Sequence, residues 1–327
     1  MLRSAFSLLS PAGNAARLSI LIFHRVHAAR DELFPAEPDA RRFDEICGWL
    51  KAWFNVLPLD EAVDRLGNRR LPARAACITF DDGYADNFGV ALPILLRHRL
   101  PATFFIASGY LNGGRMFNDS IVELVRRSPL ATLNLAGLGL NCGDCLPLGG
   151  AAARPTAIAA LIAELKYRHP DERLELSRAL QARAGVDQIP DDLMMRSDQV
   201  RAMHLSGMQI GAHTVTHPIL ARLEPAAIRD EIQRGKAELE SIIGAPVSLF
   251  AYPNGRPVVD YDETSLQLVQ QAGFRAAVST ARGSSDARTD HFQLPRFTPW
   301  DVSSLRFGMR LLANLRRRAE LLPVAAA

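Results

Sequence analysis

The chain has 327 residues, of which 48% are hydrophobic and 22% are charged, and its formal net charge is +3 at pH 7. This composition is typical of a soluble globular protein with one large domain or two ordinary ones. Because the charge is nearly balanced and no basic stripe carries interleaved aromatic residues, the composition argues against nucleic acid as a partner.

The first 17 residues are predicted to form an extension before the folded domain. Their apolar run, residues 5–9, is shorter than the core of a usual signal peptide, and no stretch predicts a transmembrane helix. We therefore expect a cytoplasmic protein, with association with the cell envelope as the alternative.

Short apolar strands alternate with helices in the first part of the folded domain. The apolar run over residues 19–23 stops at His24, as expected for a buried strand with a polar residue at its exit. Helix 42–54 has its large apolar residues on one face. The full prediction for this part is strand 19–23, helix 42–54, strand 55–57, a helix after 58–60 that ends at 66, strand 76–80, helix 85–98 and strand 103–107.

An inserted region, residues 109–195, then interrupts the alternation. It is rich in glycine, leucine and alanine and predicts two helices, 156–167 and 171–184. Its length favours a functional lid or cap, and a small subdomain remains the alternative. Cys142 and Cys145 within it form a C-x-x-C pattern, but a second pair for a metal and a helix start for a redox motif are both missing, so we interpret them as incidental thiols.

The alternation resumes and predicts a barrel. The remaining elements are helix 197–207, strand 208–211, helix 224–243, strand 248–251, helix 263–272, strand 275–279 and an extended piece 292–297. Seven or eight strands, most followed by a helix, favour a (β/α) barrel over residues 18–302, with functional side chains at the carboxyl ends of the strands. The basic tail, 303–327, predicts a helix packed on the barrel; peripheral contact with an anionic membrane is the alternative.

Polar residues follow several of these predicted strands. Asp81 and Asp82 come directly after strand 76–80, and because successive side chains of an extended segment point to opposite faces, the two should have different surroundings. A solvated Asp-Gly turn is the alternative interpretation. His213 and His217 are separated by three residues, a spacing that lets both imidazoles reach one metal ion.

Neither pattern is decisive alone, since H-x-x-x-H often contains one core and one exposed histidine. Together, His213, His217 and one of the two aspartates form the two-histidine, one-carboxylate set that is usual in hydrolytic zinc centres. The other aspartate would then be a base.

The segment Thr79-Phe80-Asp81-Asp82-Gly83, with His213-Thr-x-x-His217-Pro218, resembles the first two motifs of the NodB-homology polysaccharide deacetylases, carbohydrate esterase family four. The resemblance covers residues 18–300 apart from the insertion. It implies a distorted (β/α)7 TIM-like barrel with the insertion between the two motifs. It also implies a divalent metal, zinc first and nickel or cobalt as alternatives, on Asp82, His213 and His217, with Asp81 as the general base.

The third family motif, R-x-P-Y-G, is only partly matched by residues 250–255. Ala251 stands where the family has the arginine that braces the catalytic aspartate, and we expect Arg296 to take its place from a neighbouring strand. The backbone around Tyr252, Asn254 and Gly255 is the candidate site for the oxyanion of the tetrahedral intermediate and for substrate binding.

The late L-x-H motif that supplies the family's general acid is not evident. Residues 22–26, Ile-Phe-His-Arg-Val, instead resemble the Y-H-x-[IV] start of the poly-N-acetylglucosamine deacetylase branch, whose early histidine occupies the acid's place. The resemblance therefore implies that His24 protonates the leaving amine, with His291 as the second candidate.

The function expected from these patterns is metal-dependent removal of N-acetyl groups from a polysaccharide or oligosaccharide. Two alternatives remain open: deacetylation of a small or lipid-linked amino sugar, and a catalytically silent carbohydrate-binding barrel. The expected partner is an N-acetylated glycan, and the sequence does not indicate an oligomeric state.

Overall fold

The computed structural model describes residues 2–150 and 152–323 of the chain. Its centre is a seven-stranded sheet with parallel pairing and the order β1-β3-β4-β7-β8-β9, in which the short β2 pairs with the start of β3. Its strands are β1 (Leu18–Phe23), β2 (Asn55–Val56), β3 (Ala75–Phe80), β4 (Thr103–Ile106), β7 (Gln209–Ala212), β8 (Leu249–Ala251) and β9 (Ala276–Val278).

An irregular stretch, residues 294–297, lies between β9 and β1. Leu294 forms a parallel bridge with Val278 of β9, and Phe297 forms one with Leu21 of β1. The sheet therefore curls round on itself, with too few hydrogen bonds at this joint for a regular strand. The predicted distorted (β/α) barrel is confirmed, and the last predicted extended piece is its closing segment.

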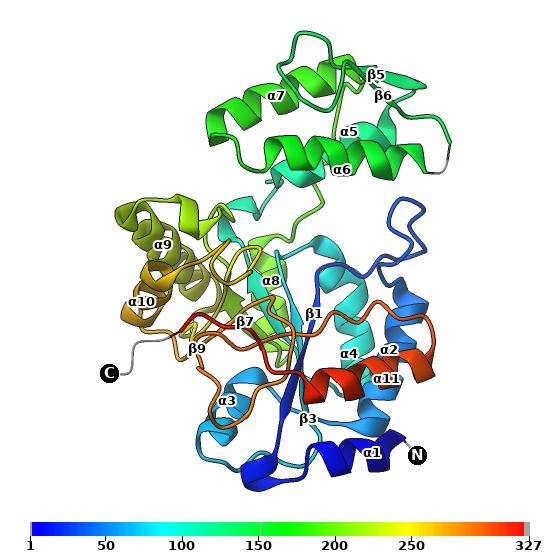
Figure 1. Cartoon of the computed structure of the whole chain (residues 1–327). Coiled ribbons are helices and arrows are strands. Elements are labelled where there is room, and N and C mark those ends of the chain that lie inside the picture. The colour runs from blue at the N-terminus through cyan, green and yellow to red at the C-terminus, as the bar shows by residue number, and fades with distance from the viewer. Residues whose placement is uncertain (1, 151, 324–327) are drawn as a thin grey trace. The chain divides into compact units, whose positions relative to one another are not determined.

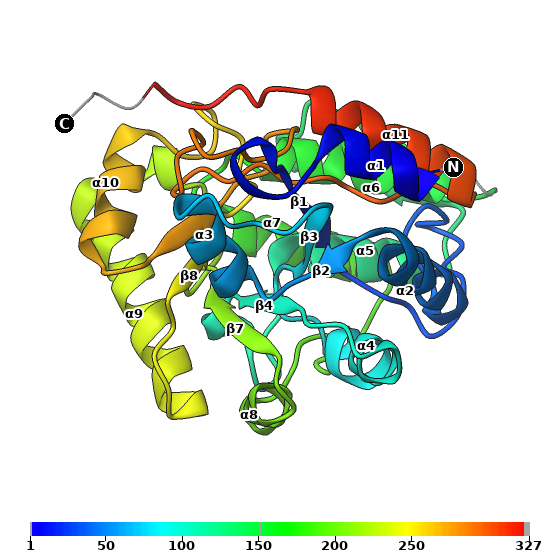
Figure 2. The ribbon, with the colours of Figure 1, turned by 90° about the horizontal axis from the view of Figure 1, so that it is seen from below.

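Helices cover the outside of the curled sheet (Figures 1 and 2). Asp39 caps the first turn of one of them by accepting the Arg42 N–H at 2.7 Å, and Gly244 ends another in the left-handed conformation, with φ of 69°. The helices are α1 (Leu2–Leu9), α2 (Ala40–Trp53), α3 (Leu59–Gly67), α4 (Leu92–His98), α8 (Ser197–Leu205), α9 (Pro225–Ile243), α10 (Glu263–Gln271) and α11 (Ser304–Arg316).

The two terminal helices belong to the same compact unit as the barrel. Phe6 of α1 is fully buried against Trp53 and Phe54, and Leu2 lies against Gly308 of α11. The residues expected to be a separate extension therefore contribute to the hydrophobic core. None of the described helices is long and apolar enough to cross a bilayer.

The predicted helix 85–98 is divided in two. A π-helical turn, Asn87–Ala91, precedes the regular helix α4, which has Pro93 in its first turn. Proline has no N–H to continue an existing helix but fits the start of a new one, which accounts for the division. The π-turn lies directly after the Asp81-Asp82 segment, and such turns are frequent at functional sites.

Residues 30–35 and 113–193 form a second compact unit with its own hydrophobic core. Sequence reasoning missed helix α5, although its apolar residues Ile121, Leu124 and Val125 share one buried face, and it missed the antiparallel hairpin of β5 and β6, whose strands have only three residues each. Cys142 and Cys145 are free thiols in or beside the hairpin. The elements are α5 (Phe117–Arg127), β5 (Thr132–Asn134), β6 (Cys145–Pro147), α6 (Ala153–Leu165) and α7 (Pro170–Arg183).

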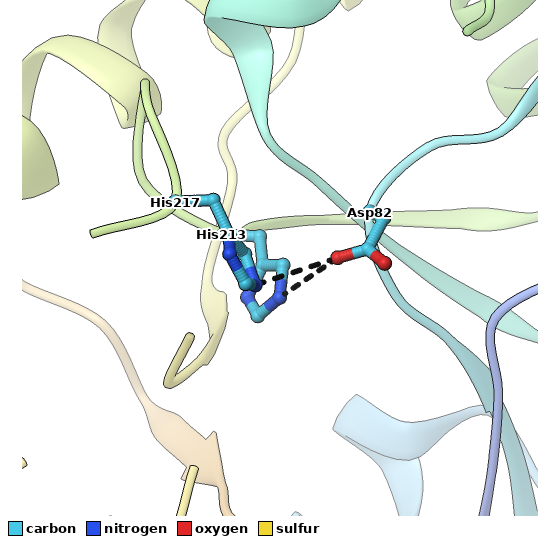
Figure 3. Close-up of side chains that lie close together, drawn as sticks. All are labelled: Asp82, His213 and His217. Carbon is cyan, nitrogen blue, oxygen red and sulfur yellow. Dashed lines mark ion pairs between the residues drawn. The ribbon is translucent and has the colours of Figure 1, made fainter. Parts of the chain in front are cut away.

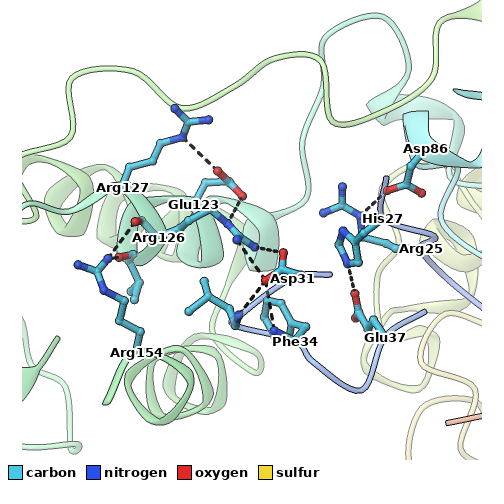
Figure 4. A network of polar contacts seen from close by, with 12 residues as sticks. Arg25, His27, Asp31, Phe34, Glu37, Asp86, Glu123, Arg126, Arg127 and Arg154 are labelled. Atoms are coloured by element: carbon cyan, nitrogen blue, oxygen red, sulfur yellow. Dashed lines mark hydrogen bonds and ion pairs between the residues drawn. The ribbon is translucent and has the colours of Figure 1, made fainter. Parts of the chain in front are cut away.

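Polar contacts tie the short segment 30–35 to α5 in this unit (Figure 4). Arg126 donates to both carboxylate oxygens of Asp31, at 3.2 and 2.7 Å, and also pairs with Glu123. Glu123 has a second partner in Arg127 at 3.1 Å. Because Asp31 and Glu123 are both largely buried, these pairs fix the segment against the helix.

Candidate active site

The predicted site residues follow strands of the barrel sheet that end at one rim. His24 follows β1, Asp81 follows β3, His213 follows β7 and Tyr252 follows β8. Phe23 and Phe80, the last residues of β1 and β3, are register partners, so His24 and Asp81 leave the sheet at the same level. Because all these strands are parallel, residues far apart in sequence meet at the carboxyl end of the barrel.

Asp82, His213 and His217 form a compact cluster with one carboxylate oxygen facing two imidazoles (Figure 3). The Oδ1 atom of Asp82 lies 3.5 Å from Nε2 of His213 and 3.5 Å from Nε2 of His217. The three potential ligand atoms are all within 4.8 Å of one another. The structure thus brings together the three residues that the sequence indicated as metal ligands.

The cluster fits a divalent cation. Buried Oδ1 of Asp82 has no hydrogen-bond donor among the described residues, which is costly for a charged oxygen unless a cation satisfies it. Zinc–ligand distances of about 2.0–2.2 Å place neighbouring ligand atoms of a tetrahedral site about 3.4 Å apart, close to the two contacts of 3.5 Å. Two nitrogens and one oxygen are also the donor set of catalytic zinc sites with open positions.

His213 is oriented by the sheet. Its Nδ1 atom lies 2.7 Å from the carbonyl oxygen of Ala251, which can only accept, so Nδ1 carries the proton and Nε2 faces Asp82. Burial lowers the pKa of His213, but the nearby carboxylates of Asp82 and Asp81 outweigh it and hold the pKa above its ordinary value. Burial also lowers the pKa of His217, to about 4, against the influence of Asp82.

The backbone at the cluster adopts conformations that are unusual for residues with a side chain. Asp82, Thr214 and His217 have positive φ angles of 76°, 66° and 53°. Such conformations persist only where the surroundings hold them. Gly235 of α9 allows part of this support, because a Cβ there would lie 2.9 Å from the carbonyl carbon of Thr214.

Glu231 of α9 holds the loop between the two histidines, and sequence reasoning missed it. Its Oε2 atom accepts the N–H groups of Val215 and Thr216, both at 2.9 Å, and its Oε1 atom accepts the Thr216 hydroxyl at 2.6 Å. The only signal in the sequence is an acidic residue early in the helix that follows the loop. This carboxylate therefore sets the geometry in which His217 faces Asp82.

Asp81 has a different environment from its neighbour Asp82. Arg296 donates to both of its oxygens, from Nη1 to Oδ1 and from Nη2 to Oδ2, each at 2.7 Å. The Arg296 Nε atom donates to the carbonyl oxygen of Ser279 at 2.9 Å, and both Asp81 and Arg296 are almost completely buried. Arg296 occupies the bracing position that Ala251 leaves vacant.

The charge state of Asp81 follows from these contacts. Burial raises the pKa of Asp81, but the positive charges of Arg296, His213 and His24 outweigh it and hold the pKa below its ordinary value. The carboxylate is therefore ionised at neutral pH. Its Oδ2 atom lies 4.0 Å from Nε2 of His213, so the base candidate is immediately beside the cluster.

His24 is exposed at the rim, and its charge contributes to lowering the pKa values of Asp81, Asp82 and His217. Its backbone carbonyl accepts a hydrogen bond from the Asn87 side chain at 2.8 Å. The structure therefore brings His24 to the cluster.

Asp86 anchors the residues that follow His24. It accepts from Arg25 Nε at 2.8 Å (Figure 4) and from the Val26 N–H at 3.2 Å. His291, the second acid candidate, lies elsewhere, since it packs against Gly67 at the end of α3, on the side where β3 begins.

Only part of the segment after β8 is free for its expected role in binding the oxyanion and the substrate. Tyr252 is fully buried, its ring stacks on Tyr261 with 3.9 Å between centroids, and its N–H donates to the carbonyl of Val278 at 3.2 Å. The Gly255 N–H donates to Pro253, so neither N–H is available to a ligand. Asn254, half-exposed with φ of 58°, has the one N–H of this turn without an acceptor among the described residues.

Comparison with known proteins agrees with this geometry. The family model for polysaccharide deacetylase matches residues 68–131 and 169–277, more than half of the chain. The chain belongs to the polysaccharide deacetylase family. It is therefore a deacetylase of the hydrolase class, with the two matched segments carrying Asp81, Asp82, His213 and His217.

Individual relatives are distant. The Bacillus subtilis (strain 168) protein YxkH is 19% identical over 283 residues, which are 86% of this chain and 71% of YxkH. The Streptococcus pyogenes deacetylase PplD in complex with acetate has 20% identity and a TM-score of 0.59, over 92% of this chain and 99% of that chain. IcaB from Ammonifex degensii has 16% identity and a TM-score of 0.56, over 94% and 99%. These likenesses show the same fold.

Replacing Glu231 by glutamine should weaken metal binding by this deacetylase. A glutamine side chain has one oxygen acceptor in place of two, so the loop N–H groups and the Thr216 hydroxyl cannot all be satisfied. Loss of a group that orients a ligand typically costs about 10–100-fold in metal affinity. A competition titration with a chromogenic chelator measures the metal affinity, and Glu175→Gln, at an exposed glutamate of α7, is the matched control. An affinity equal to that of the wild type would contradict the positioning role.

Metal affinity should also depend on pH. Because the pKa of metal-free His213 is raised, a cation must displace a proton from Nε2 below that pKa, and apparent affinity should fall as the pH falls. His217, with its pKa near 4, should contribute little to this dependence around neutrality. Calorimetric titration in buffers of different ionisation enthalpy measures the released proton. A dissociation constant that is constant between about pH 6 and pH 8 would contradict this account.

Proposed function

We propose that the protein hydrolyses the acetamido group of an N-acetylated glycan, with a divalent cation held by Asp82, His213 and His217. The observation that carries this proposal is the contrast between two adjacent aspartates. Asp82 presents an unsatisfied oxygen to two imidazoles, whereas Asp81 is fixed and charged by Arg296. Zinc is our first choice of metal, with nickel or cobalt as alternatives. When bound, such a cation polarises the acetyl carbonyl and lowers the pKa of water.

Asp81 acts as the general base in this proposal. Its carboxylate is ionised and held at one orientation by two hydrogen bonds from Arg296, so it is ready to accept a proton from the attacking water. The lowered pKa of Asp81 makes its carboxylate a weak base. Proton transfer to it is still feasible because a bound cation would also lower the pKa of the water.

His24 acts as the general acid. The leaving group is an amine, which departs slowly unless it is protonated as the tetrahedral intermediate collapses. His24 is exposed at the rim beside the cluster, and the hydrogen bond from Asn87 to its carbonyl fixes its backbone. The N–H of Asn254 is the candidate donor to the oxyanion, because its neighbours in the turn already have acceptors.

Replacing His24 by alanine is expected to lower kcat about 100-fold with N-acetyl sugar substrates, the lower range for loss of an acid–base group. The deficit should shrink with an acetanilide whose leaving amine is a weaker base, because such an amine needs less protonation. The test compares the kcat of the wild type, His24→Ala and His169→Ala, whose histidine is exposed in the second unit. An undiminished rate for His24→Ala would remove the acid role.

The substrate class we favour is a glucosamine polymer of the poly-N-acetylglucosamine type. The resemblance of residues 22–26 to that branch supports it, as does the overall fold shared with IcaB and with a protein described as a de-N-acetylase from Aggregatibacter actinomycetemcomitans, at 17% identity and a TM-score of 0.58.

The proposal is tested with N-acetylglucosamine and its oligomers of increasing length. Acetate is quantified, and mass spectrometry locates the free amine. We expect a rate that rises from the monosaccharide to the longer oligomers. A higher rate on the monosaccharide or on a lipid-linked amino sugar would favour a small substrate, and no free amine on any N-acetylated sugar would refute the proposal.

A further inference from the structure

Four arginines line one cavity at the end of the barrel opposite the active site. Arg17 precedes β1, Arg69 lies between α3 and β3, Arg288 lies in the connection after β9, and Arg318 follows α11. The cavity has a volume of about 420 Å³ and is completed by Asn14, Ala15, Ala16, Asp286 and Ala287. Four segments distant in sequence therefore each bring an arginine to the same cavity.

The backbone places this cavity where the strands begin. Leu18, the first residue of β1, forms an antiparallel bridge with Ser285, which brings Arg17 beside Asp286. The N–H of Gly13 donates to the carbonyl of Leu71, just after Arg69 in sequence, at 3.0 Å. The active-site residues follow the carboxyl ends of the same strands, so the cavity is a separate site.

The charges around the cavity are not balanced. The lining residues include four arginines and one aspartate, Asp286, so their formal net charge is +3. The carboxylate of Asp286 forms a hydrogen bond within its own loop, because Oδ1 accepts the N–H of Arg288 at 3.0 Å. Its Oδ2 atom is 4.0 Å from Nη1 of Arg17. Arg69, Arg288 and Arg318 have no ion pair within the part of the chain that the structure describes.

Positive charges gathered without counter-charges repel one another and raise the free energy of the folded state. A ligand with two or more negative charges and several acceptor oxygens would relieve this repulsion and accept the paired N–H groups of more than one guanidinium. We propose that the cavity binds a phosphate-bearing group, such as a diphosphate or the headgroup of an anionic phospholipid.

This inference does not depend on the proposed function, because none of its residues touches the metal cluster. A soluble diphosphate and a lipid headgroup offer the same chemistry to the four arginines, so the experiment needs one arm for each source. Glutamine is the suitable replacement for the exposed arginines, since it keeps length and polarity and removes the charge.

The first arm titrates the full-length protein with pyrophosphate by calorimetry. Removing one charged donor from a phosphate site typically weakens binding about tenfold, so Arg69→Gln and Arg288→Gln should each do so, and the double variant about 100-fold. Arg229→Gln replaces an exposed arginine of α9 that does not line this cavity, so it changes the net charge by the same amount as each single variant and should bind pyrophosphate like the wild type.

Thermal unfolding gives a readout that does not depend on activity. Pyrophosphate should raise the melting temperature of the wild type and of Arg229→Gln but not that of the double variant. Without pyrophosphate, the double variant should melt no lower than the wild type, because a repulsion has been removed. Failure of pyrophosphate to bind the wild type, or equal weakening by Arg229→Gln, would overturn the proposal.

The second arm identifies the source. Sedimentation with vesicles of phosphatidylglycerol and phosphatidylcholine is compared with vesicles of phosphatidylcholine alone. Binding to the anionic vesicles that the double variant loses would assign the site to a lipid headgroup. Pyrophosphate binding without any vesicle binding would assign it to a soluble phosphate compound. Vesicle binding that the double variant retains in full would contradict a role of the cavity in membrane contact.

Discussion

Replacing Asp81 by asparagine is expected to lower kcat about 1,000-fold while the protein keeps its metal. The loss follows from the role of a positioned base, which typically contributes 100- to 10,000-fold. Metal should be retained because the donor atoms of Asp82, His213 and His217 are unchanged and because Oδ2 of Asp81 is 4.0 Å from Nε2 of His213, beyond hydrogen-bond distance. Metal content by mass spectrometry and initial rates of acetate release measure both quantities.

Asp198→Asn is the matched control for this substitution. Its carboxylate is exposed and pairs with Arg196 on the surface, so both rate and metal content should be unchanged. Asp81→Asn leaves the buried Arg296 without a full negative charge, so rates are to be compared below the melting temperature of the variant. Equal acetate release by Asp81→Asn and the wild type would exclude Asp81 as the base.

Replacing Arg296 by methionine should lower the free energy of unfolding by about 3–5 kcal/mol at neutral pH, the usual cost of leaving one member of a buried ion pair alone. Arg296 is 1% exposed and Asp81 is 2% exposed, and each oxygen of Asp81 accepts one guanidinium N–H. The same variant should lose activity, because Asp81 is no longer held in position. Chemical denaturation of the metal-free protein measures the stability change.

The double variant Asp81→Asn with Arg296→Met separates a lost ion pair from a lost packing contact. It removes both charges, so it should be more stable than Arg296→Met alone. A double variant as unstable as expected from adding the two single effects would contradict the pairing argument.

The deficit of Arg296→Met should also depend on pH. In the wild type, the folded-state pKa of Asp81 is lowered, so its contribution is present above the ordinary carboxyl pKa of about 3.9 and is lost as the pH falls through the folded value. In the variant, burial without Arg296 raises that pKa, and protonation relieves the unpaired charge. The deficit should therefore be largest at neutral pH and smaller in acid.

Local sequence signals were sufficient for the barrel strands and for the residues of the metal cluster. Buried parallel strands are short, continuous apolar runs, and the polar residue after each run is by topology at the carboxyl rim. His213, His217 and one of the two aspartates could be grouped on this ground before any distance was known, and the resemblance to the family motifs selected Asp82. Arg296 was expected because the resembled family motif has an arginine where this chain has Ala251, and the structure shows why one is needed, since the buried Asp81 carboxylate requires a cationic partner.

Residues that support the site from other elements had no comparable signal. Glu231 is one acidic residue among several on α9, and only the folded structure shows that it faces the loop between the histidines. Tyr252 looked like a ligand contact because of its position after β8, but its N–H is used in the sheet and its ring packs on Tyr261. Hydrogen bonds and side-chain packing of this kind depend on tertiary contacts that spacing alone does not encode.

The most direct test of the central claim is acetate release from N-acetylglucosamine oligomers by chelator-treated protein before and after zinc is added back. The account predicts that release falls to background on chelation and returns with about one bound ion per chain. Asp82→Ala, which lacks the carboxylate of the cluster, should not recover under the same conditions. Full acetate release by protein shown to contain no metal would contradict the account.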